Sequence, residues 1–407
     1  MMPLNSHYSP GLKPQEAETR IRDFTRLLPP VLEPLAGCEQ RVLREAIYAP
    51  APFPAADRVC MDGIAVRWAA GQECWRHAGR QYAGDRAKEL PALDAAIEVA
   101  TGAICPSGAD TVIPYESLRD APSDAEPYWE LRPGTAIAPG KNIQRRGSEQ
   151  AHGQLLLEPF SLLRAPELCL LAAIGKAVVP VSRKPRISLI SNGTELVPIA
   201  AEPLPHQRRE CNNAAAAACL LAFRYEAIQS FHAPDHVEAL AEILQGALRS
   251  SDVVVCSGGI SQGPRDLLRD RLCVAGITAV FYQIAQKPGR PLWFGVGPGG
   301  QLVFALPGNP VAALMNLRRY VLPALAQMEG RQMPLQQLHL DTSLQLSKAE
   351  MLPVRIEPTG GGSAWARPLP YRGSGDFTSL AGSDGFVALE AGAYERGALV
   401  AFYGWTP

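Results

Sequence analysis

The chain lacks an excess of charge of either sign, since 39 Lys and Arg residues stand against 40 Asp and Glu residues in a length of 407. Without a net field the chain has nothing to attract nucleic acid or an anionic membrane, so we expect neither as a partner. Any anionic ligand must then be held by local groups. No stretch approaches about 18 uncharged apolar residues, and residues 1–14 contain no apolar segment of the kind found in secretion signals. The sequence therefore predicts neither membrane spanning nor export.

The chain also lacks a C-x-x-C pair, and its nine cysteines are scattered. An odd, dispersed set is typical of reduced thiols and does not indicate a disulfide framework or a zinc site. We therefore expect a cytoplasmic protein. The 37 prolines indicate many turns and short edge strands, whereas a hydrophobic content of 47% excludes a disordered proline-rich chain. The length predicts several soluble domains.

The N-terminal half changes texture along its length. Residues 14–28 and 38–46 carry apolar residues at helical spacing, which predicts two helices. Residues 59–139 consist of short apolar runs between Gly, Pro and Asp turns, the pattern of a small β-rich module. A further helix is predicted over 166–174. We expect the part of the chain around residues 155–174 to pack against the N-terminal helices.

Residues 186–329 have the rhythm of an α/β domain, because strand-like segments alternate with helical patterns. The expected strands of a mostly parallel sheet cover 187–190, 227–231, 253–256 and 279–284. The alanine run from Ala214 to Ala218 is typical of one buried helix. After Gly330 short strands return and predict a small C-terminal β domain. Its strands are expected at 338–346, 352–357, 386–389 and 399–402.

The strand over 253–256 runs into a glycine-rich loop that begins Ser257, Gly258, Gly259. Glycine lets backbone N–H groups approach an anion closely, and a serine hydroxyl adds a donor. Ligands of such sheets bind beyond the carboxyl ends of the strands, so the loop suits a phosphate. Asp266 would repel a phosphate unless a divalent cation bridged the two, which makes it a candidate metal ligand or base. A tight turn capped by Asp266 explains the same residues without a ligand.

A second loop puts two cations around a Pro-Gly turn. Lys287 and Arg290 lie three residues apart, and the fixed φ of the intervening proline keeps both side chains on one surface. Two fixed cations suit a small oxyanion. Lys and Arg side chains on a surface are usually only solvated, so a purely structural interpretation stays open.

A third loop follows the apolar strand 303–305 and precedes a long apolar helix. It consists of Pro307, Gly308, Asn309 and Pro310. Asn309 is placed as the helix N-cap and Pro310 as the first helical residue, so helix initiation alone explains the loop. It does not explain why three Gly/Pro loops all lie at the ends of strands.

The N-terminal half contains three further polar segments that are candidates for a binding site: residues 57–63, 100–110 and 141–149. The Asp-Gly pair at 62–63 and the Gly-Ala-Asp at 108–110 can be simple turns. The basic segment 141–149 can be an exposed turn.

Taken in order, these segments resemble the MoeA and gephyrin E-domain family of molybdopterin molybdotransferases over residues 13–405. Seven motifs carry the resemblance: Asp-x-x-x-Met-Asp-Gly at 57–63, Thr-Gly-Ala at 101–103, Arg-Arg-Gly before an acidic residue at 145–149, Ser-x-Gly-x-Glu-Leu at 191–196, Ser-Gly-Gly at 257–259, Lys-Pro-Gly-Arg-Pro at 287–291 and Leu-Pro-Gly-Asn-Pro at 306–310. No single motif decides the matter, but seven in this order do not arise by chance.

The resemblance implies a multidomain α/β plus β fold with a Rossmann-like α/β domain that binds molybdopterin. Its domains would be a helical N-terminal domain in two segments, an inserted β-rich module, the α/β domain and a C-terminal β domain, at 13–52 with 143–183, 53–142, 184–329 and 333–407. It also implies a homodimer with its active site between subunits. Adenylyl-molybdopterin and molybdate would be the substrates, AMP a product and Mg²⁺ the divalent cation, with a molybdopterin adenylyltransferase and molybdoenzyme acceptors as further partners.

The resemblance assigns roles to residues as well. The molybdate ligands would be Lys287, Arg290, Arg355 and Ser379. Pterin and phosphate would be cradled by Ser257, Gly258, Gly259, Pro307, Gly308, Asn309 and Pro310. The catalytic residues would be Asp62, Thr101, Glu149, Glu195 and Asp266. The metal ligands among them would be Asp62, Glu195 and Asp266, and the residues reaching the site from the second subunit would be Asp62, Thr101 and Glu149.

The chain departs from the family pattern at a few positions. Glu210-Cys211-Asn212 stands where many members have an acidic residue followed by Thr and Asn, and Pro264 lies in a segment with fewer carboxylates. Ala312 and Ile64 replace a common serine and a common tyrosine. Two other functions stay open: a catalytically weak scaffold that binds molybdopterin, and an adenylyltransferase that acts one step earlier. The absence of an interaction tail argues against the first, and the extra N-terminal and C-terminal parts argue against the second.

Overall fold

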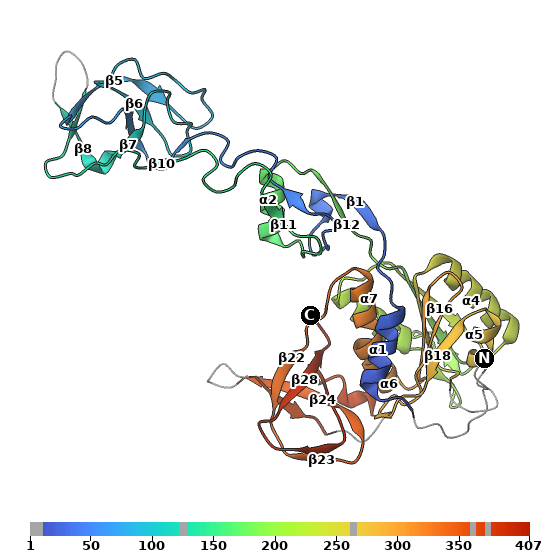
Figure 1. Cartoon of the computed structure of the whole chain (residues 1–407). Coiled ribbons are helices and arrows are strands. Elements are labelled where there is room, and N and C mark those ends of the chain that lie inside the picture. The colour runs from blue at the N-terminus through green and yellow to red at the C-terminus, as the bar shows by residue number, and fades with distance from the viewer. Residues whose placement is uncertain (1–10, 122–127, 261–266, 359–363, 371–375) are drawn as a thin grey trace. The chain divides into compact units, whose positions relative to one another are not determined.

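The computed structural model describes residues 11–121, 128–260, 267–358, 364–370 and 376–407 (Figure 1). The chain divides into a smaller unit, Glu33–Val179, and a larger unit, Met1–Leu32 with Pro180–Pro407. All nine cysteines are free thiols. Within the described ranges, no helix is long and apolar enough to cross a membrane.

The smaller unit contains the β-rich module that the sequence predicts. Its six-stranded sheet has the order β7 (Thr111–Pro114), β4 (Gly63–Val66), β6 (Ala95–Val99), β5 (Cys74–Gln81), β9 (Tyr128–Leu131), β8 (Leu118–Ala121). Apolar side chains cover both faces: Ala65 and Ile97 pack on one side, whereas Ile64 and Trp75 pack on the other. Strand β3 (Arg58–Val59), which precedes β4 in the chain, pairs with β10 (Ile143–Gln144) in a separate two-stranded antiparallel sheet.

The remainder of the smaller unit corrects one expectation. The helix predicted over 38–46 is absent. The segment is irregular and comes directly after a short 3-10 turn, Leu35–Gly37. Its backbone pairs instead with the returning chain: Leu43 N donates to Ser161 O at 2.9 Å, and Leu163 N donates to Arg41 O at 2.9 Å. Long-range pairing of this kind satisfies the backbone and overrides a weak helical propensity.

The helix predicted over 166–174 is confirmed as α2 (Ala165–Ala173), and it packs beside the 3-10 turn at Leu35–Gly37. Strands β2 (Ile47–Tyr48) and β11 (Leu155–Leu157) pair, as do β1 (Pro30–Pro34) and β12 (Val178–Ser182). Residues 155–174 therefore contact the irregular segment around 35–48. Helix α1 (Pro14–Phe24) buries Ala17 and Ile21 in the core of the larger unit, and the second N-terminal helix on which 155–174 was expected to pack is replaced by this irregular segment.

The larger unit is built on the six-stranded sheet expected for residues 186–329. Its order is β16 (Ile228–Ala233), β13 (Ile187–Asn192), β17 (Val253–Ser257), β21 (Leu302–Leu306), β20 (Trp293–Val296), β18 (Thr278–Tyr282). The first four strands pair in parallel. Strand β20 pairs antiparallel with both β21 and β18, so only β20 runs against the others, which confirms a mostly parallel sheet.

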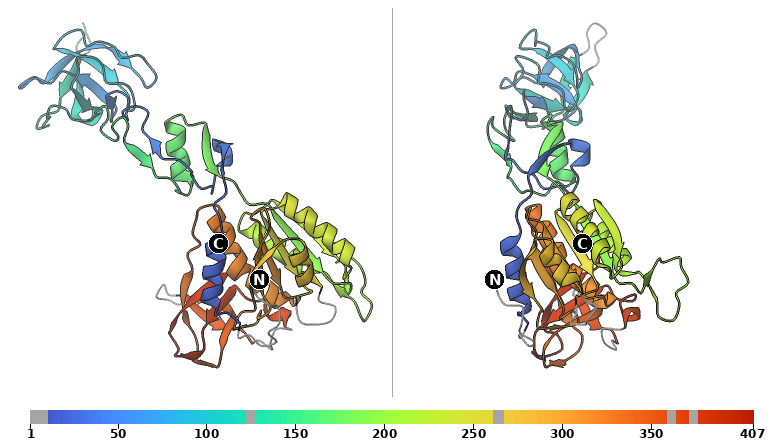
Figure 2. Two further views of the ribbon diagram at one scale, coloured as in Figure 1. Left: turned by 45° about the vertical axis from the view of Figure 1, so that its right-hand side comes forward. Right: turned by 90° about the vertical axis from the view of Figure 1, so that its right-hand side faces the viewer.

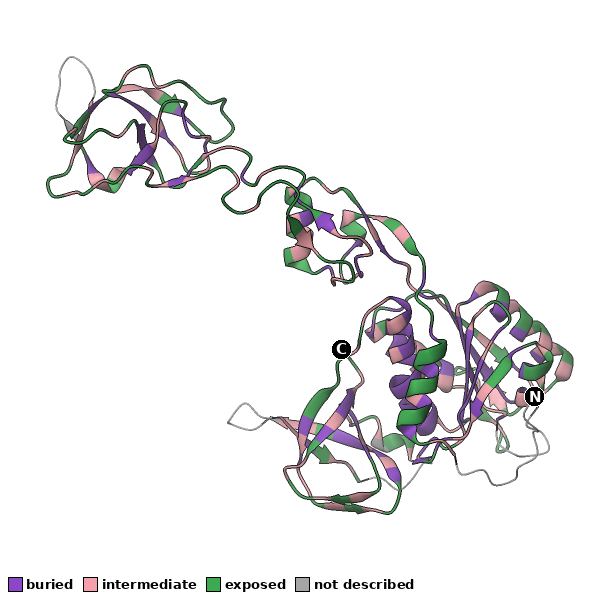
Figure 3. Cartoon of the chain, in the orientation of Figure 1, coloured by how far each residue is buried: buried purple, intermediate pink, exposed green. Residues whose placement is uncertain are grey.

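Helices cover both faces of this sheet (Figure 2). One layer contains α1, α3 (Asn212–Ala222), α6 (Pro310–Asn316) and α7 (Leu322–Met328), with a π-helical turn at Leu317–Val321 between the last two. The other layer contains α4 (Val237–Ser250) and α5 (Leu268–Val274). Val253 and Val255 face the first layer, whereas Val254 and Cys256 face the second. The central strands are therefore buried along their whole length (Figure 3), as the continuous apolar run requires.

The C-terminal β domain is a closed, barrel-like sheet. Its strands are β22 (Gln336–Leu340), β24 (Ala349–Pro358), β25 (Ala364–Pro368), β26 (Gly385–Leu389) and β28 (Leu399–Gly404), and pairing of β24 with β26 closes it. A two-residue strand from the α/β domain, β19 (Gln286–Lys287), pairs in parallel with β24. Phe386 and Tyr403 of the barrel pack against Met315, and the buried Arg318 donates from Nε to Gly404 O at 2.6 Å. The barrel is thus fixed to the helical layer of the same unit.

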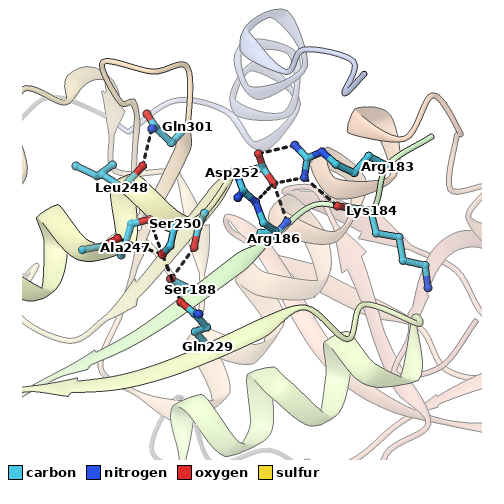
Figure 4. Close-up of polar contacts among 12 residues, drawn as sticks. Arg183, Lys184, Arg186, Ser188, Gln229, Ala247, Leu248, Ser250, Asp252 and Gln301 are labelled. Carbon is cyan, nitrogen blue, oxygen red and sulfur yellow. Dashed lines mark hydrogen bonds and ion pairs between the residues drawn. The ribbon is translucent and has the colours of Figure 1, made fainter. Parts of the chain in front are cut away.

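An ion-pair cluster ties together the amino ends of β13 and β17 (Figure 4). Arg183 donates to both carboxylate oxygens of Asp252 at 2.8 Å, and the backbone N–H of Arg186 donates at 2.8 Å. Burial opposes ionisation of Asp252, but these hydrogen bonds outweigh it and lower the pKa of Asp252 to about 2. The cluster lies at the opposite edge of the sheet from the glycine-rich loops, so it concerns stability.

Replacing Asp252 tests this assignment. Asp252→Asn should lower the free energy of unfolding by about 1 to 2 kcal/mol near pH 7, after allowance for solvent screening of a partly exposed pair. Because the pKa of Asp252 is lowered on folding, the stabilisation is present above the usual value of 3.8 and is lost as the pH falls towards 2. The Tm values of wild type and variant, measured by calorimetry, should therefore differ near pH 7 and approach each other near pH 3.

The control is Glu238→Gln, since Glu238 and its partner His236 are both well exposed. This variant should leave Tm almost unchanged. A gap between wild type and Asp252→Asn that stays constant with pH would rule out ionisation of Asp252 as the source of the stabilisation.

Candidate functional site

Three loops leave the same edge of the six-stranded sheet. The carboxyl ends of β17 and β21 are in register, because Ser257 pairs with Leu306. Trp293 pairs with Ala305 on one side and with Tyr282 on the other, so the loop 283–292 also begins at this edge. The carboxyl edge of a parallel sheet is where such folds bind ligands.

The loops after β17 and β21 touch through their backbones. Gly258 N donates to Leu306 O at 3.1 Å, and a Cβ added to Gly308 would lie 3.4 Å from Gly258 Cα. Gly258 has φ +90°, and a Cβ there would meet the Asn192 carbonyl oxygen at 2.3 Å. Only glycine fits at this point, so the loop backbone here carries no side chain.

Two polar atoms beside this contact are buried without a hydrogen-bond partner among the described residues: Ser257 Oγ and Asn192 Oδ1. Buried polar atoms in native proteins are nearly always paired with protein, water or ligand. Ser257 was expected from the sequence to serve the site, whereas Asn192 was not. Its signal was its position inside the Ser-x-Gly-x-Glu-Leu motif.

The start of α3 supplies further amides that sequence reasoning missed. Asn212 Nδ2 donates to Gly308 O at 3.0 Å, and Asn213 Nδ2 donates to Phe231 O at 2.9 Å. The Glu210 carboxylate accepts from Asn213 N at 2.8 Å, as a capping residue of the helix does. The acidic residue that precedes Cys211 therefore stabilises the helix start.

The loop Pro307–Pro310 initiates a helix, as predicted. The Asn309 side chain accepts from Ala312 N at 3.1 Å, and Pro310 is the first residue of α6. Helix initiation and contact with the glycine-rich loop are thus two properties of one segment. The capping oxygen of Asn309 is engaged by the helix.

The turn that carries Lys287 and Arg290 is held from two sides. Asn316, at the last position of α6, donates from Nδ2 to Gly289 O at 3.1 Å and accepts from Gln286 Nε2 at 2.7 Å. Tyr320 OH donates to Gln286 Oε1 at 2.5 Å, so the buried network extends into the π-helical turn. On the outer side Lys287 Nζ lies 2.9 Å from Glu350 Oε1 of the barrel. Arg290 Nη2 donates to Gln283 Oε1 at 3.4 Å.

The other predicted residues of the larger unit lie apart from these contacts. Arg355 of β24 donates from Nε and Nη2 to Gly382 O at 3.2 and 3.0 Å, and Ser379 ends a short 3-10 helix that precedes Gly382 in the chain. Glu195 is exposed in the loop after β13. Asp266 lies outside the described residues. No contact in the structure joins Arg355 to Lys287, so their common role stays a prediction.

In the smaller unit the structure brings Asp62 and Thr101 together. Thr101 donates to Asp62 Oδ1 from its backbone N at 2.7 Å and from its hydroxyl at 2.8 Å. The backbone hydrogen bond first, and then the hydroxyl, lower the pKa of Asp62, so this exposed carboxylate stays ionised. Glu149 accepts a hydrogen bond from Gln144 and takes no part in the Asp62 contact.

Comparison with known proteins places these features. Residues 12–175 match the MoeA N-terminal region (domain I and II), residues 188–327 a probable molybdopterin binding domain, and residues 337–405 the MoeA C-terminal region (domain IV). A molybdopterin molybdenumtransferase of Synechocystis is 34% identical over 378 residues, which cover 91% of this chain and 93% of that protein. The chain belongs to the molybdopterin molybdenumtransferase family.

Further similarities agree with this membership. The molybdopterin molybdenumtransferase of Haemophilus influenzae is 29% identical, with 89% of each chain covered. A crystal structure of a molybdopterin biosynthesis MoeA protein from Pyrococcus horikoshii matches with a TM-score of 0.80 at 27% identity, over 98% of this chain and 100% of that one. The predicted multidomain fold is confirmed, and the chain is a transferase of molybdenum cofactor biosynthesis.

Gly289 offers a test of the network that holds the Lys287 turn. Gly289 has φ +85°, and an added Cβ would lie 2.7 Å from the Asn316 side chain. Gly289→Ala should therefore lower the free energy of unfolding by about 3 kcal/mol, because backbone strain and a clash add together.

The matched control is Gly300→Ala, since Gly300 has the same φ of +85° but nothing within 4 Å of its Cβ position. It should cost only about 1 kcal/mol. Chemical denaturation of both variants checks the difference, and equal losses would show that Asn316 does not constrain the turn.

Proposed function

We propose that the chain inserts molybdate into the dithiolene of adenylyl-molybdopterin and releases AMP, as the last step of molybdenum cofactor synthesis. The observation that supports this most directly is the glycine contact between Gly258 and Gly308, beside the unpartnered Ser257 Oγ and Asn192 Oδ1. A glycine backbone without side chains, next to buried and unpaired polar atoms, suits a polar heterocycle with a phosphate.

In this proposal the chain's own residues bind and orient the two substrates. The Ser257 hydroxyl and the backbone amide of Gly259 donate to the pterin phosphate, whereas Gly258, whose amide donates to Leu306 O, lines the site. Lys287 and Arg290 attract molybdate, because fixed cations hold a small tetrahedral dianion by charge and hydrogen bonding. Arg355 and Ser379 are proposed to complete the molybdate site.

A magnesium ion is proposed to act with these residues. Among the described residues no group of three or more His, Cys, Asp or Glu side chains could hold a metal by itself. This donor set still fits Mg²⁺, which usually takes one or two carboxylates and completes its shell with water and substrate phosphate oxygens. Glu195 on its exposed loop and the ionised Asp62 are suitable carboxylates, with Asp266 as a third candidate. The bound ion would supply positive charge to the phosphate linkage.

We also propose that the protein acts in the cytoplasm as a homodimer in which Asp62, Thr101 and Glu149 of one subunit serve the loops of the other. A molybdopterin adenylyltransferase would deliver its substrate, and molybdoenzymes would accept its product. The Asp62–Thr101 contact supports a catalytic role, since an exposed carboxylate with two donors on one oxygen keeps its charge.

Release of AMP decides between this function and a binding scaffold. Purified protein incubated with adenylyl-molybdopterin, molybdate and Mg²⁺ should produce AMP, and Lys287→Ala or Asp62→Asn should lower the rate by about 100-fold, the usual effect of removing one charged or donor group from a reacting centre. Asp62 is exposed and the Lys287 side chain is 45% exposed, so circular dichroism should show unchanged folding. Wild-type protein that binds the substrate and never forms AMP would support the scaffold instead.

Mixing the two variants tests the shared site. If Asp62 and Lys287 of different subunits form one centre, heterodimers of Lys287→Ala with Asp62→Asn contain one intact site of two. An equal mixture that exchanges subunits should then recover about one quarter of the wild-type rate. If both residues act within one chain, each subunit is inactive and the mixture recovers nothing.

A further inference from the structure

Glu350 lies on β24 of the barrel, directly beside Lys287 of the α/β domain. The two residues are register partners in the parallel pairing of β19 with β24, and Lys287 Nζ lies 2.9 Å from Glu350 Oε1. Neighbouring residues of parallel strands project on the same side of a sheet, so the contact follows from the backbone pairing. The Glu350 side chain is only 14% exposed, whereas that of Lys287 is 45% exposed.

The position of this pair differs from that of other surface ion pairs. The backbone around Lys287 is already fixed by the buried network of Gln286, Asn316 and Tyr320. A lysine side chain on such a turn still has several rotatable bonds, and its ammonium samples many positions. The half-buried carboxylate at 2.9 Å limits that freedom, so the barrel fixes the direction of an ammonium that the α/β domain supplies.

The same carboxylate has an opposing effect on charge. The Glu350 carboxylate lowers the positive potential around Lys287, because a negative charge a few ångströms from the ammonium cancels part of its field at a partly buried site. An oxyanion arriving at Lys287 therefore meets an oriented but partly neutralised cation. Orientation favours the reaction, and weaker attraction favours transfer of the oxyanion onward.

We propose that Glu350 is a positioning residue that aims Lys287 at the incoming oxyanion and moderates its affinity for it. The proposal rests on the proposed molybdate insertion for its kinetic consequence. Glu350 itself exchanges no proton or bond with the substrate. Its contribution separates into two measurable parts, because positioning acts on turnover and charge acts on binding.

Glu350→Gln separates these parts, since glutamine keeps the shape and removes the charge. The KM for molybdate should fall about threefold to tenfold, as the Lys287 charge is unmasked, and kcat should fall about tenfold because a neutral amide holds the ammonium more weakly than a carboxylate does. Glu350→Asp keeps the charge with a shorter reach, so it should leave KM near the wild-type value and lower kcat less. A merely structural role would lower Tm and leave the two constants unchanged or worsen both.

The matched control is Glu357→Gln on the same strand. Glu357 lies 2.6 Å from Arg367 in another carboxylate ion pair of β24, but it has no contact with Lys287 among the described residues. Its kcat and KM should match those of the wild type. An equal shift in this control would assign the effect to the strand and overturn the role of Glu350.

A second readout does not depend on turnover. The rate at which acetic anhydride modifies the Lys287 amine, followed by mass spectrometry of the full-length protein, should rise severalfold in Glu350→Gln, because the amine is released from its partner. Calorimetry with molybdate alone should show tighter binding to the same variant. If both change as expected while wild-type protein releases no AMP, the proposed function fails and the role of Glu350 in oxyanion binding stands. If Lys287 reactivity is unchanged, the ion pair does not hold the lysine, and the inference fails whatever the activity.

Discussion

The close approach of two backbones at the carboxyl edge of the sheet is the constraint on which the candidate site depends. Strands β17 and β21 are paired in register, so their following loops must leave side by side, and Gly258 meets Gly308. A side chain at Gly258 would overlap the Asn192 carbonyl, so the packing excludes any residue other than glycine there. The contact between these two loops of the candidate site is thus a product of sheet register.

The cations of the site are placed by a different principle. The turn around Lys287 is not part of the main sheet, and its conformation depends on Asn316 at the end of the helix that Asn309 begins. One helix therefore links the loop that contacts Gly258 to the turn that presents Lys287. The barrel adds Glu350 through strand pairing with β24. Helix α6 and strand β24 thus both hold the Lys287 turn, and both contacts lie within the larger unit.

Local sequence signals predicted the features that local physics decides. The βαβ alternation, the buried run before Ser257 and the capping role of Asn309 all follow from spacing and propensity, and the structure confirms them. The helix expected over 38–46 failed because Leu43 pairs with a segment far along the chain. The sequence did not predict the contact of Glu350 with Lys287 for the same reason, since the two residues are far apart in the chain. Register between distant strands is a tertiary property, and composition does not reveal it.

Each of the two units also holds its candidate site residues through contacts of its own. In the smaller unit, Thr101 holds Asp62 through hydrogen bonds to one oxygen, and these alone lower the pKa of the carboxylate. In the larger unit, Glu350 contacts Lys287, and Asn316 holds the Gly289 carbonyl of the same turn. For the proposed function, each set of groups is therefore ordered before substrate arrives, and little binding energy is needed to order them. At the start of α3 the chain departs from the family pattern at Cys211 but keeps the acidic residue before it, and the Glu210 carboxylate accepts from Asn213 N and so stabilises the helix start.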